Sequence, residues 1–138
     1  MQEASDKNSG MPEITKLFLV LGGVNAMLVV VLGAFGAHFL KTRIPGDMMA
    51  VYQTAALYHA IHALGLIAIG VVTVWLTESI YLKSAGWIMF AGIVLFSGSL
   101  YLLSVTGVRW LGAITPIGGM AFILAWLLFC VAVLKAAN

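Results

Sequence analysis

Charged side chains are scarce in this chain of 138 residues, which has seven Lys and Arg, five Asp and Glu, and a net charge of +2. About a quarter of the residues in a soluble domain are charged, so the 9% found here excludes an ordinary soluble domain. The few cations form no basic patch, which argues against nucleic acid as a partner. Cys130 is the only cysteine, so a disulfide framework within the chain is excluded.

Long apolar runs occupy almost all of the rest of the sequence. We expect four membrane-spanning helices at about residues 15–40, 49–76, 84–105 and 110–135, because about 20 apolar residues cross a bilayer. Inside lipid, helices satisfy every backbone hydrogen bond within the segment. The sequence therefore predicts an all-α polytopic membrane protein. Its antiparallel bundle of four transmembrane helices fills residues 14–138 in contact with the lipid bilayer, after a polar, disordered tail over residues 1–13.

The basic residues indicate an orientation for this bundle. Four lie on the side of the two termini and three on the opposite side: Lys7, Lys16, Lys83 and Lys135 against Lys41, Arg43 and Arg109. Positive residues are enriched on the cytoplasmic side of membrane proteins. We therefore expect both termini to be cytoplasmic.

Small residues recur at the spacing that lets membrane helices approach closely. Gly33 and Ala37 are four residues apart, which places them on one helix face. We expect packing roles for Gly22, Gly33, Gly36, Ala37, Gly98, Gly118 and Gly119. The contact lies either within one bundle or between protomers.

Polar side chains inside the apolar runs are the candidates for function, because an unpaired polar group is costly in hydrocarbon. Thr54, Tyr58 and His62 follow at intervals of four residues, and His59 lies three residues before His62, so the two imidazoles could share one site. Ser97 and Tyr101 form a second stripe. The candidate intramembrane site comprises Asn25, His38, Gln53, Thr54, Tyr58, His59, His62, Ser97, Ser99, Tyr101 and Thr115.

Three hypotheses account for these residues. In the first, the imidazoles bond to hydroxyls such as those of Ser97, Ser99 and Tyr101, and the site is structural. In the second, Tyr58, His62 and Ser97 line the path of a proton or small-solute transporter or channel. In the third, His38 and His62 bind a haem or a metal ion, which imidazole ligands suit. The spans contain no Asp or Glu, which disfavours proton-coupled transport and a Ser-His-Asp hydrolase.

Four short motifs resemble those of a family of small bacterial inner-membrane proteins, domain-of-unknown-function family 423. They are GAFGAH at Gly33–His38, Gln53-Thr54 leading to Tyr58 and His62, LFSGSLY at Leu95–Tyr101, and TPIGG at Thr115–Gly119. The resemblance covers about residues 16–134. It implies four helices in the bacterial inner (plasma) membrane with cytoplasmic termini, and it supplies no reaction, substrate or cofactor.

Size, glycine-rich faces and the lack of intramembrane acids together favour the first hypothesis. We expect a non-enzymatic structural or accessory subunit with no catalytic residues, no metal and no cofactor. Its partner would be a larger membrane complex or further copies of the chain.

Overall fold

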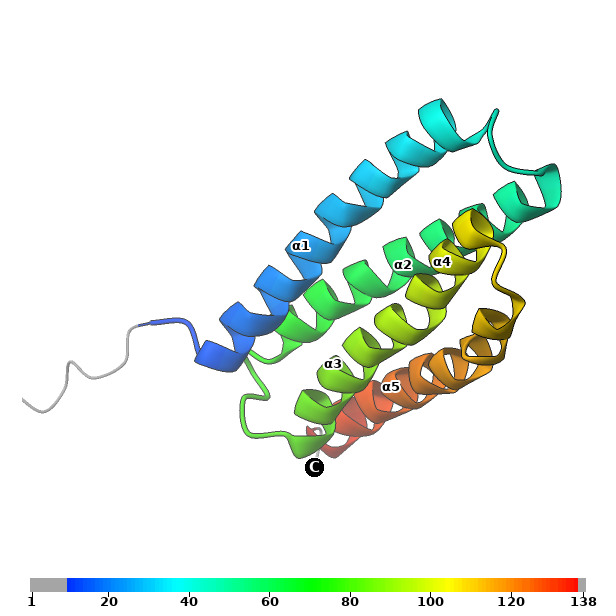
Figure 1. Cartoon of the computed structure of the whole chain (residues 1–138). Helices are drawn as coiled ribbons and strands as arrows, with labels where there is room; N and C mark the ends of the chain where they lie inside the picture. The colour runs from blue at the N-terminus through cyan, green and yellow to red at the C-terminus, as the bar shows by residue number, and fades with distance from the viewer. Residues whose placement is uncertain (1–9, 137–138) are drawn as a thin grey trace, which may run out of the picture.

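Residues 10–136 are described by the structure, a computed structural model of the chain. Four helical spans run up and down through the molecule, and each is long and apolar enough to cross a membrane (Figure 1). They are Glu13–Leu40, Gly46–Val72, Ile80–Thr106 and Arg109–Ala136, with 27 or 28 residues each. At 1.5 Å per residue each span is about 40 Å long, which exceeds the hydrocarbon thickness of about 30 Å. The helices must therefore tilt or extend into the headgroups.

Only the second span is one uninterrupted α-helix, α2 (Gly46–Val72). The first consists of α1 (Glu13–Phe35) and the π-helix η1 (Gly36–Leu40). The third consists of α3 (Ile80–Gly92), the π-helix η2 (Ile93–Gly98) and α4 (Ser99–Thr106). The fourth begins with a 3₁₀ turn, η3 (Arg109–Ala113), and continues as α5 (Thr115–Ala136).

The helix ends follow local signals that hydropathy does not report. Pro45 precedes α2, so the second span begins three residues before the expected residue 49. Beyond Val72 the backbone turns, and α2 ends four residues before the expected residue 76. The hydroxyl of Ser79 accepts a bond from the Leu82 amide at 3.3 Å, so α3 begins at Ile80 instead of about residue 84. Most of the expected tail, residues 1–9, lies outside the described residues.

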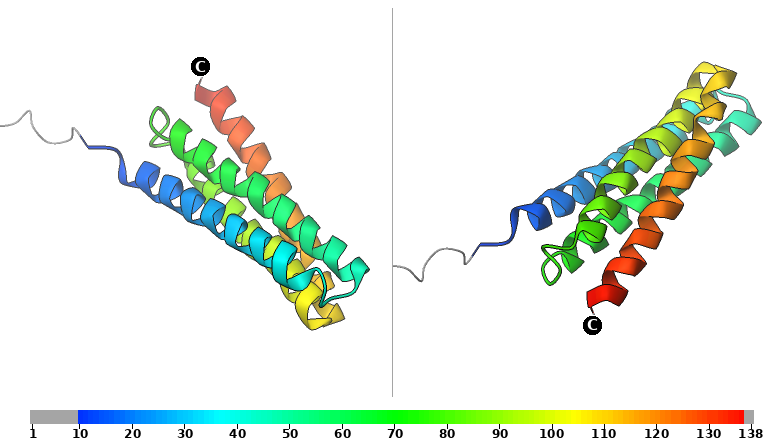
Figure 2. Two further views of the ribbon diagram at one scale, coloured as in Figure 1. Left: turned by 90° about the horizontal axis from the view of Figure 1, so that it is seen from above. Right: turned by 90° about the horizontal axis from the view of Figure 1, so that it is seen from below.

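The helices pack mainly in two pairs, with α1 along α2 and α5 along α3 (Figure 2). The two pairs join where α2 contacts α3, η2 and α4. Near the end with the termini, Phe18 of α1 lies over Gly86 of α3 and meets Trp87 edge to face at 5.9 Å. At the same end the hydroxyls of Thr15 and Thr73, both fully buried, lie 2.9 Å apart and connect α1 to the end of α2.

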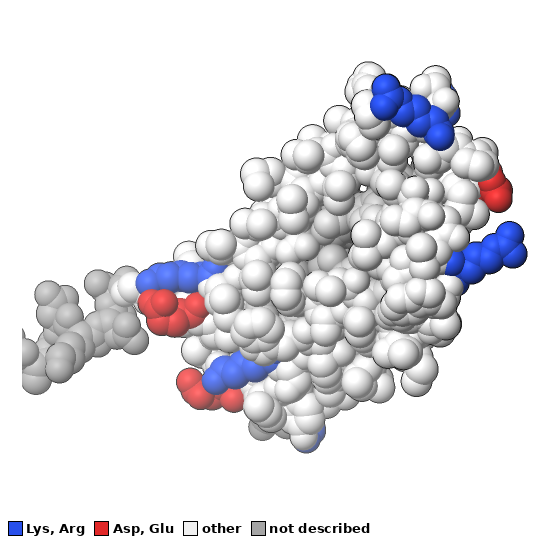
Figure 3. All heavy atoms as spheres, in the orientation of Figure 1, with Lys and Arg blue, Asp and Glu red and all other residues white. Residues whose placement is uncertain are grey.

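The outer surface suits lipid. In Figure 3 the charged side chains gather at the two ends of the molecule, and a wide uncharged band separates them. Large apolar side chains are exposed in that band, for example Val30 and Ile123, each 72% exposed. Such surface is normal against hydrocarbon and abnormal against water. Regular structure over residues 10–136 is entirely helical, so the prediction of an all-α bundle of four spanning helices is confirmed.

Candidate functional site

Polar side chains from three spans form a hydrogen-bonded chain inside the bundle. Asn25 on α1 and His59 on α2 are only 5% and 4% exposed, and 3.0 Å separates Oδ1 of Asn25 from Nε2 of His59. The second ring nitrogen of His59, Nδ1, lies 3.4 Å from the hydroxyl of Tyr101 on α4. These contacts connect α1, α2 and α4 in the interior.

The backbone next to Asn25 determines which groups donate. Nδ2 of Asn25 donates to the carbonyl oxygen of Leu21 at 2.7 Å, so Oδ1 is the atom that faces His59. An amide oxygen only accepts, so Nε2 of His59 carries the proton and Nδ1 carries the lone pair. The Tyr101 hydroxyl therefore donates to Nδ1. A neutral imidazole with both nitrogens bonded is what a buried histidine requires.

Tyr52 on α2 adds a fourth side chain, one that we did not identify from the sequence. Its hydroxyl donates to the carbonyl oxygen of Leu32 on α1 at 2.7 Å, and its ring meets that of Tyr101 edge to face at 4.9 Å. Tyr52 lies seven residues before His59, which is about two helical turns and therefore the same face. This seven-residue spacing is the sequence feature that places Tyr52 on the same helix face as His59.

His59 and His62 do not form one site. Nδ1 of His62 donates to the carbonyl oxygen of Tyr58, 2.7 Å away on its own helix. Its ring stacks on Phe122 of α5, with centroids 3.4 Å apart and planes inclined by 8°. His62 thus faces α5, whereas His59 contacts α1 and α4. The expected bond between an imidazole and a hydroxyl forms at His59 with Tyr101, whereas His62 bonds to backbone.

His38 and His62 lie at different depths. His38 is exposed in η1 at the end of the first span, beside the loop to α2. His62 lies 16 residues after Gly46, about 24 Å along α2 from that loop. No group of three His, Cys, Asp or Glu with metal-binding geometry occurs in the described part of the chain. The structure therefore does not bring together the two histidines of the haem or metal hypothesis.

Two expected members of the polar stripe on α2 lie on the outer surface. Thr54 is exposed, and its hydroxyl donates to the Ala50 carbonyl of the same helix at 3.0 Å. Tyr58 is 39% exposed, with its ring 4.6 Å from that of Phe96. Of the stripe formed by Thr54, Tyr58 and His62, only His62 is buried, because α2 contacts the rest of the bundle along the faces of Tyr52, His59 and His62.

Gln53 lines a cleft of about 210 Å³ between the first and second spans. The cleft lies at the end of the bundle opposite the termini, with Gly33, Gly36 and Ala37 on one wall, Tyr52 on the other and Lys41 also in its lining. Neither Tyr58, His62 nor Ser97 lines it.

Two serines of the third span, Ser97 and Ser99, differ in their hydrogen bonding. The Ser99 hydroxyl donates to the Phe96 carbonyl at 3.0 Å and lies 3.0 Å from the Thr115 hydroxyl at the start of α5. Ser97 is fully buried in η2, and its hydroxyl has no hydrogen-bond partner among the described residues. Ser97 lies one turn before Tyr101 but does not join the hydrogen-bonded chain.

We expect alanine substitution of these two serines to change the free energy of unfolding in opposite directions. We expect Ser97→Ala to leave the free energy of unfolding unchanged or to raise it by up to about 1 kcal/mol, since it removes an unsatisfied buried oxygen. We expect Ser99→Ala to lower it by about 1 kcal/mol, because Thr115 loses its partner. Unfolding titrations of both variants in mixed micelles measure the difference. Equal losses would show that Ser97 has a partner of its own.

The predicted packing glycines divide into two groups. At Gly22, Gly36 and Gly118 an added Cβ would lie 2.4–2.5 Å from Ile67, Tyr52 and Phe96, respectively. At Gly33 and Gly98 no atom lies within 4 Å of such a Cβ, so these two glycines make no close contact within the described part of the chain. Gly119 makes only ordinary contact with Phe96 at 3.7 Å, and Ala37 is exposed. The glycines Gly33, Gly98 and Gly119 are half-buried and make no close helix contact.

Comparison with known proteins agrees with this architecture. The family described as "Protein of unknown function (DUF423)" matches residues 32–119. The chain is 52% identical over 120 residues to the UPF0382 membrane protein YwdK of Bacillus subtilis (strain 168), covering 87% of this chain and 98% of that protein. It is 50% identical over 123 residues to a UPF0382 membrane protein of Staphylococcus epidermidis (strain ATCC 12228 / FDA PCI 1200), covering 89% and 99%. No solved structure matches the chain. With its four apolar spans and these relatives, the chain belongs to the DUF423 family and is a polytopic membrane protein.

Proposed function

We propose that this protein is a non-enzymatic accessory subunit that docks onto another transmembrane protein through the outer face of α1. The site is the bacterial inner membrane, with both termini in the cytoplasm. Four of the seven basic residues in the sequence, counting Lys7, belong to the side of the termini by their order among the spans, and three belong to the opposite side, which supports this orientation.

The chemistry of the interior supports a structural role for the polar residues. Asn25, His59 and Tyr101 use their hydrogen-bonding capacity on one another or on backbone, and His62 uses Nδ1 on its own helix. Bonds of this kind hold membrane helices together, since hydrophobicity supplies little attraction between helices in lipid. The transporter hypothesis has less support, because Thr54 and Tyr58 lie on the outer surface.

The observation that carries the proposal is the one-sided packing of α1. Its main neighbour is α2, and its outer face exposes Gly23, where no atom lies within 4 Å of an added Cβ. Gly33 of the same helix is half-buried and lines the cleft with Gln53, into which a neighbouring helix could insert a side chain. Close approach through small residues is a common mode of helix association in membranes.

Gly23→Leu tests this docking face. We expect the wild-type protein, purified gently from its own membrane, to carry a stoichiometric partner that mass spectrometry identifies. Leucine at Gly23 should reduce the bound partner at least about tenfold, because it fills the approach surface at a position where no atom of its own chain lies within 4 Å of the added Cβ. Gly98→Leu is the matched control, since Gly98 has equal free space on the third span. Equal partner binding by both variants, or a wild-type protein that purifies alone, would contradict the proposal.

A further inference from the structure

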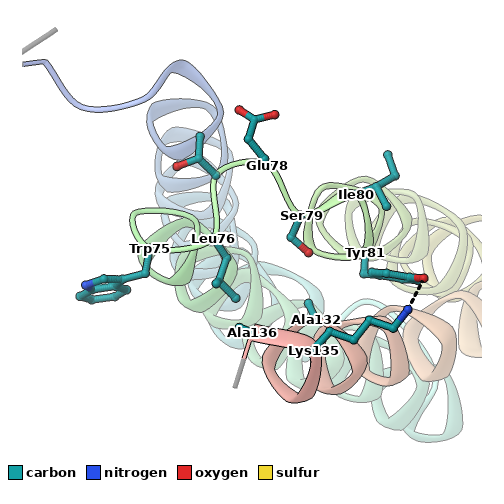
Figure 4. A pocket seen from close by; sticks show the side chains of 10 residues that line it. Trp75, Leu76, Glu78, Ser79, Ile80, Tyr81, Ala132, Lys135 and Ala136 are labelled. Carbon is teal, nitrogen blue, oxygen red and sulfur yellow. Dashed lines mark hydrogen bonds between the residues drawn. The ribbon is translucent and has the colours of Figure 1, made fainter. Parts of the chain in front are cut away.

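A hollow of about 570 Å³ opens at the end of the bundle that carries the termini (Figure 4). Its walls come from the loop after α2, the start of α3 and the last turns of α5, including Leu76, Ser79 and Ala132. Lys135 crosses this region, and its Nζ donates to the Tyr81 hydroxyl at 2.7 Å. The same nitrogen lies 4.4 Å from the centre of the Tyr81 ring. The contact holds the ammonium group at the rim of the hollow.

The charges around this ammonium group favour an anion. An ammonium group has three donors, and Tyr81 takes one of those on Lys135. No carboxylate forms an ion pair with Lys135 within residues 10–136. Glu78 also lines the hollow, but its carboxylate pairs with Lys83 at 3.4 Å and points outward in Figure 4. Lys135 therefore has donors available for a phosphate oxygen.

A second hollow, apolar and also about 570 Å³, lies along α5 and α3 in the membrane-facing surface. Its lining includes Ile88 of α3 and Ile117, Met120, Ile123, Leu124 and Leu127 of α5. Several of these side chains are strongly exposed, Met120 by 71%. Hydrocarbon chains of the bilayer are the medium that contacts such a groove.

The helical register aligns the two hollows. Tyr81 and Ile88 are seven residues apart on α3, which is close to two full turns. Lys135 and Leu124 are eleven residues apart on α5, which is close to three full turns. The Lys135–Tyr81 pair therefore lies on the same faces as the groove, about 10–17 Å away along the helices.

We propose that this surface binds one anionic phospholipid, with the headgroup phosphate on Lys135 and an acyl chain in the groove between α3 and α5. A cation at headgroup level above an apolar channel matches the shape and charge of such a lipid. Trp75 lines the hollow and is 73% exposed, and tryptophan is enriched where membrane helices meet the lipid headgroups.

Native mass spectrometry of the detergent-purified chain tests the proposal with two added lipids, dioleoylphosphatidylglycerol and dioleoylphosphatidylcholine. We expect tighter binding of the anionic lipid, and Lys135→Gln should weaken it about fivefold, the effect of one lysine near a charged headgroup. Lys83→Gln is the matched control, because Lys83 is on the same end but pairs with Glu78. Lys135→Arg keeps the charge and should keep the preference. Leu124→Trp fills the groove and should weaken both lipids.

Several results would overturn the proposal. Equal affinity for the two lipids would remove the role of charge, and equal weakening by Lys83→Gln and Lys135→Gln would remove the role of this site. Binding of inorganic phosphate as tight as that of the lipid would make the hollow a site for a free anion. Unchanged lipid binding by Leu124→Trp would overturn the place given to the acyl chain. Each variant's thermal unfolding is recorded alongside, so that only folded protein is compared.

Discussion

Alanine at Gly118 is expected to lower the free energy of unfolding by at least about 2 kcal/mol, although it adds a single methyl group. A Cβ at this position would lie 2.4 Å from the backbone nitrogen and 2.8 Å from the Cα of Phe96. Backbone atoms cannot rotate aside as a side chain can, so α5 would have to move away from η2. Phe122 lies one turn further along α5, and its stack on His62 would be disturbed by the same movement.

The adjacent glycine provides the control for this experiment. At Gly119 the nearest atom to an added Cβ is a ring carbon of Phe96 at 3.7 Å, an ordinary contact. Gly119→Ala should therefore leave the free energy of unfolding unchanged or raise it by up to about 1 kcal/mol, since alanine favours a helix more than glycine does. Unfolding titrations in mixed micelles compare the two variants directly. Similar effects of the two substitutions would show that α5 does not cross η2 at Gly118.

The second large effect is expected at the buried pair of Asn25 and His59. Asn25→Ala should lower the free energy of unfolding by about 1–3 kcal/mol, because it leaves the Nε2 proton of His59 buried without an acceptor. Thr54→Ala is the control, since that hydroxyl is exposed and bonds only to its own helix. We expect its effect to stay within about 0.5 kcal/mol.

A double-mutant cycle isolates the contact between the two side chains. His59→Phe removes the other partner. In the double variant, the decrease in the free energy of unfolding should be smaller than the sum of the decreases in the two single variants. Coupling between membrane helices averages about 0.6 kcal/mol and reaches about 1.7 kcal/mol, so we expect a value in that range. Strict additivity would mean that Asn25 and His59 do not bond in the folded protein.

The sequence was sufficient for the four spans because one physical requirement dominates a membrane helix. About 20 apolar residues must succeed one another whatever their partners are, and that pattern is visible without knowing how the helices pack. Helix ends depend on single residues instead. The Ser79 cap and the turn after Val72 shifted two boundaries by four residues, since a hydropathy window averages over such signals.

The partners of the polar residues could not be deduced in the same way. The cost of burying an amide predicts that Asn25 has a partner, but the rotation of each helix decides which one it is. His59 and His62 are three residues apart and nevertheless face different neighbours, because their faces differ by about 60° around α2. The contacts of Tyr52 with Leu32 and Tyr101 could not be deduced either, because an aromatic ring near a helix end also suits the membrane interface.

The π-helix η2 determines which way the last eight residues of the third span face. A π turn closes with i→i+5 bonds and so holds one residue more than an α turn. Since each α-helical residue advances by about 100°, α4 is rotated by roughly that angle relative to an uninterrupted helix. Gly92, before η2, lies against Phe122 of α5, and Tyr101, nine residues later, reaches His59 of α2. The extra residue acts as a phase shift that sets the direction in which Tyr101 points, and losing it would break the hydrogen-bonded chain with every member of that chain still present.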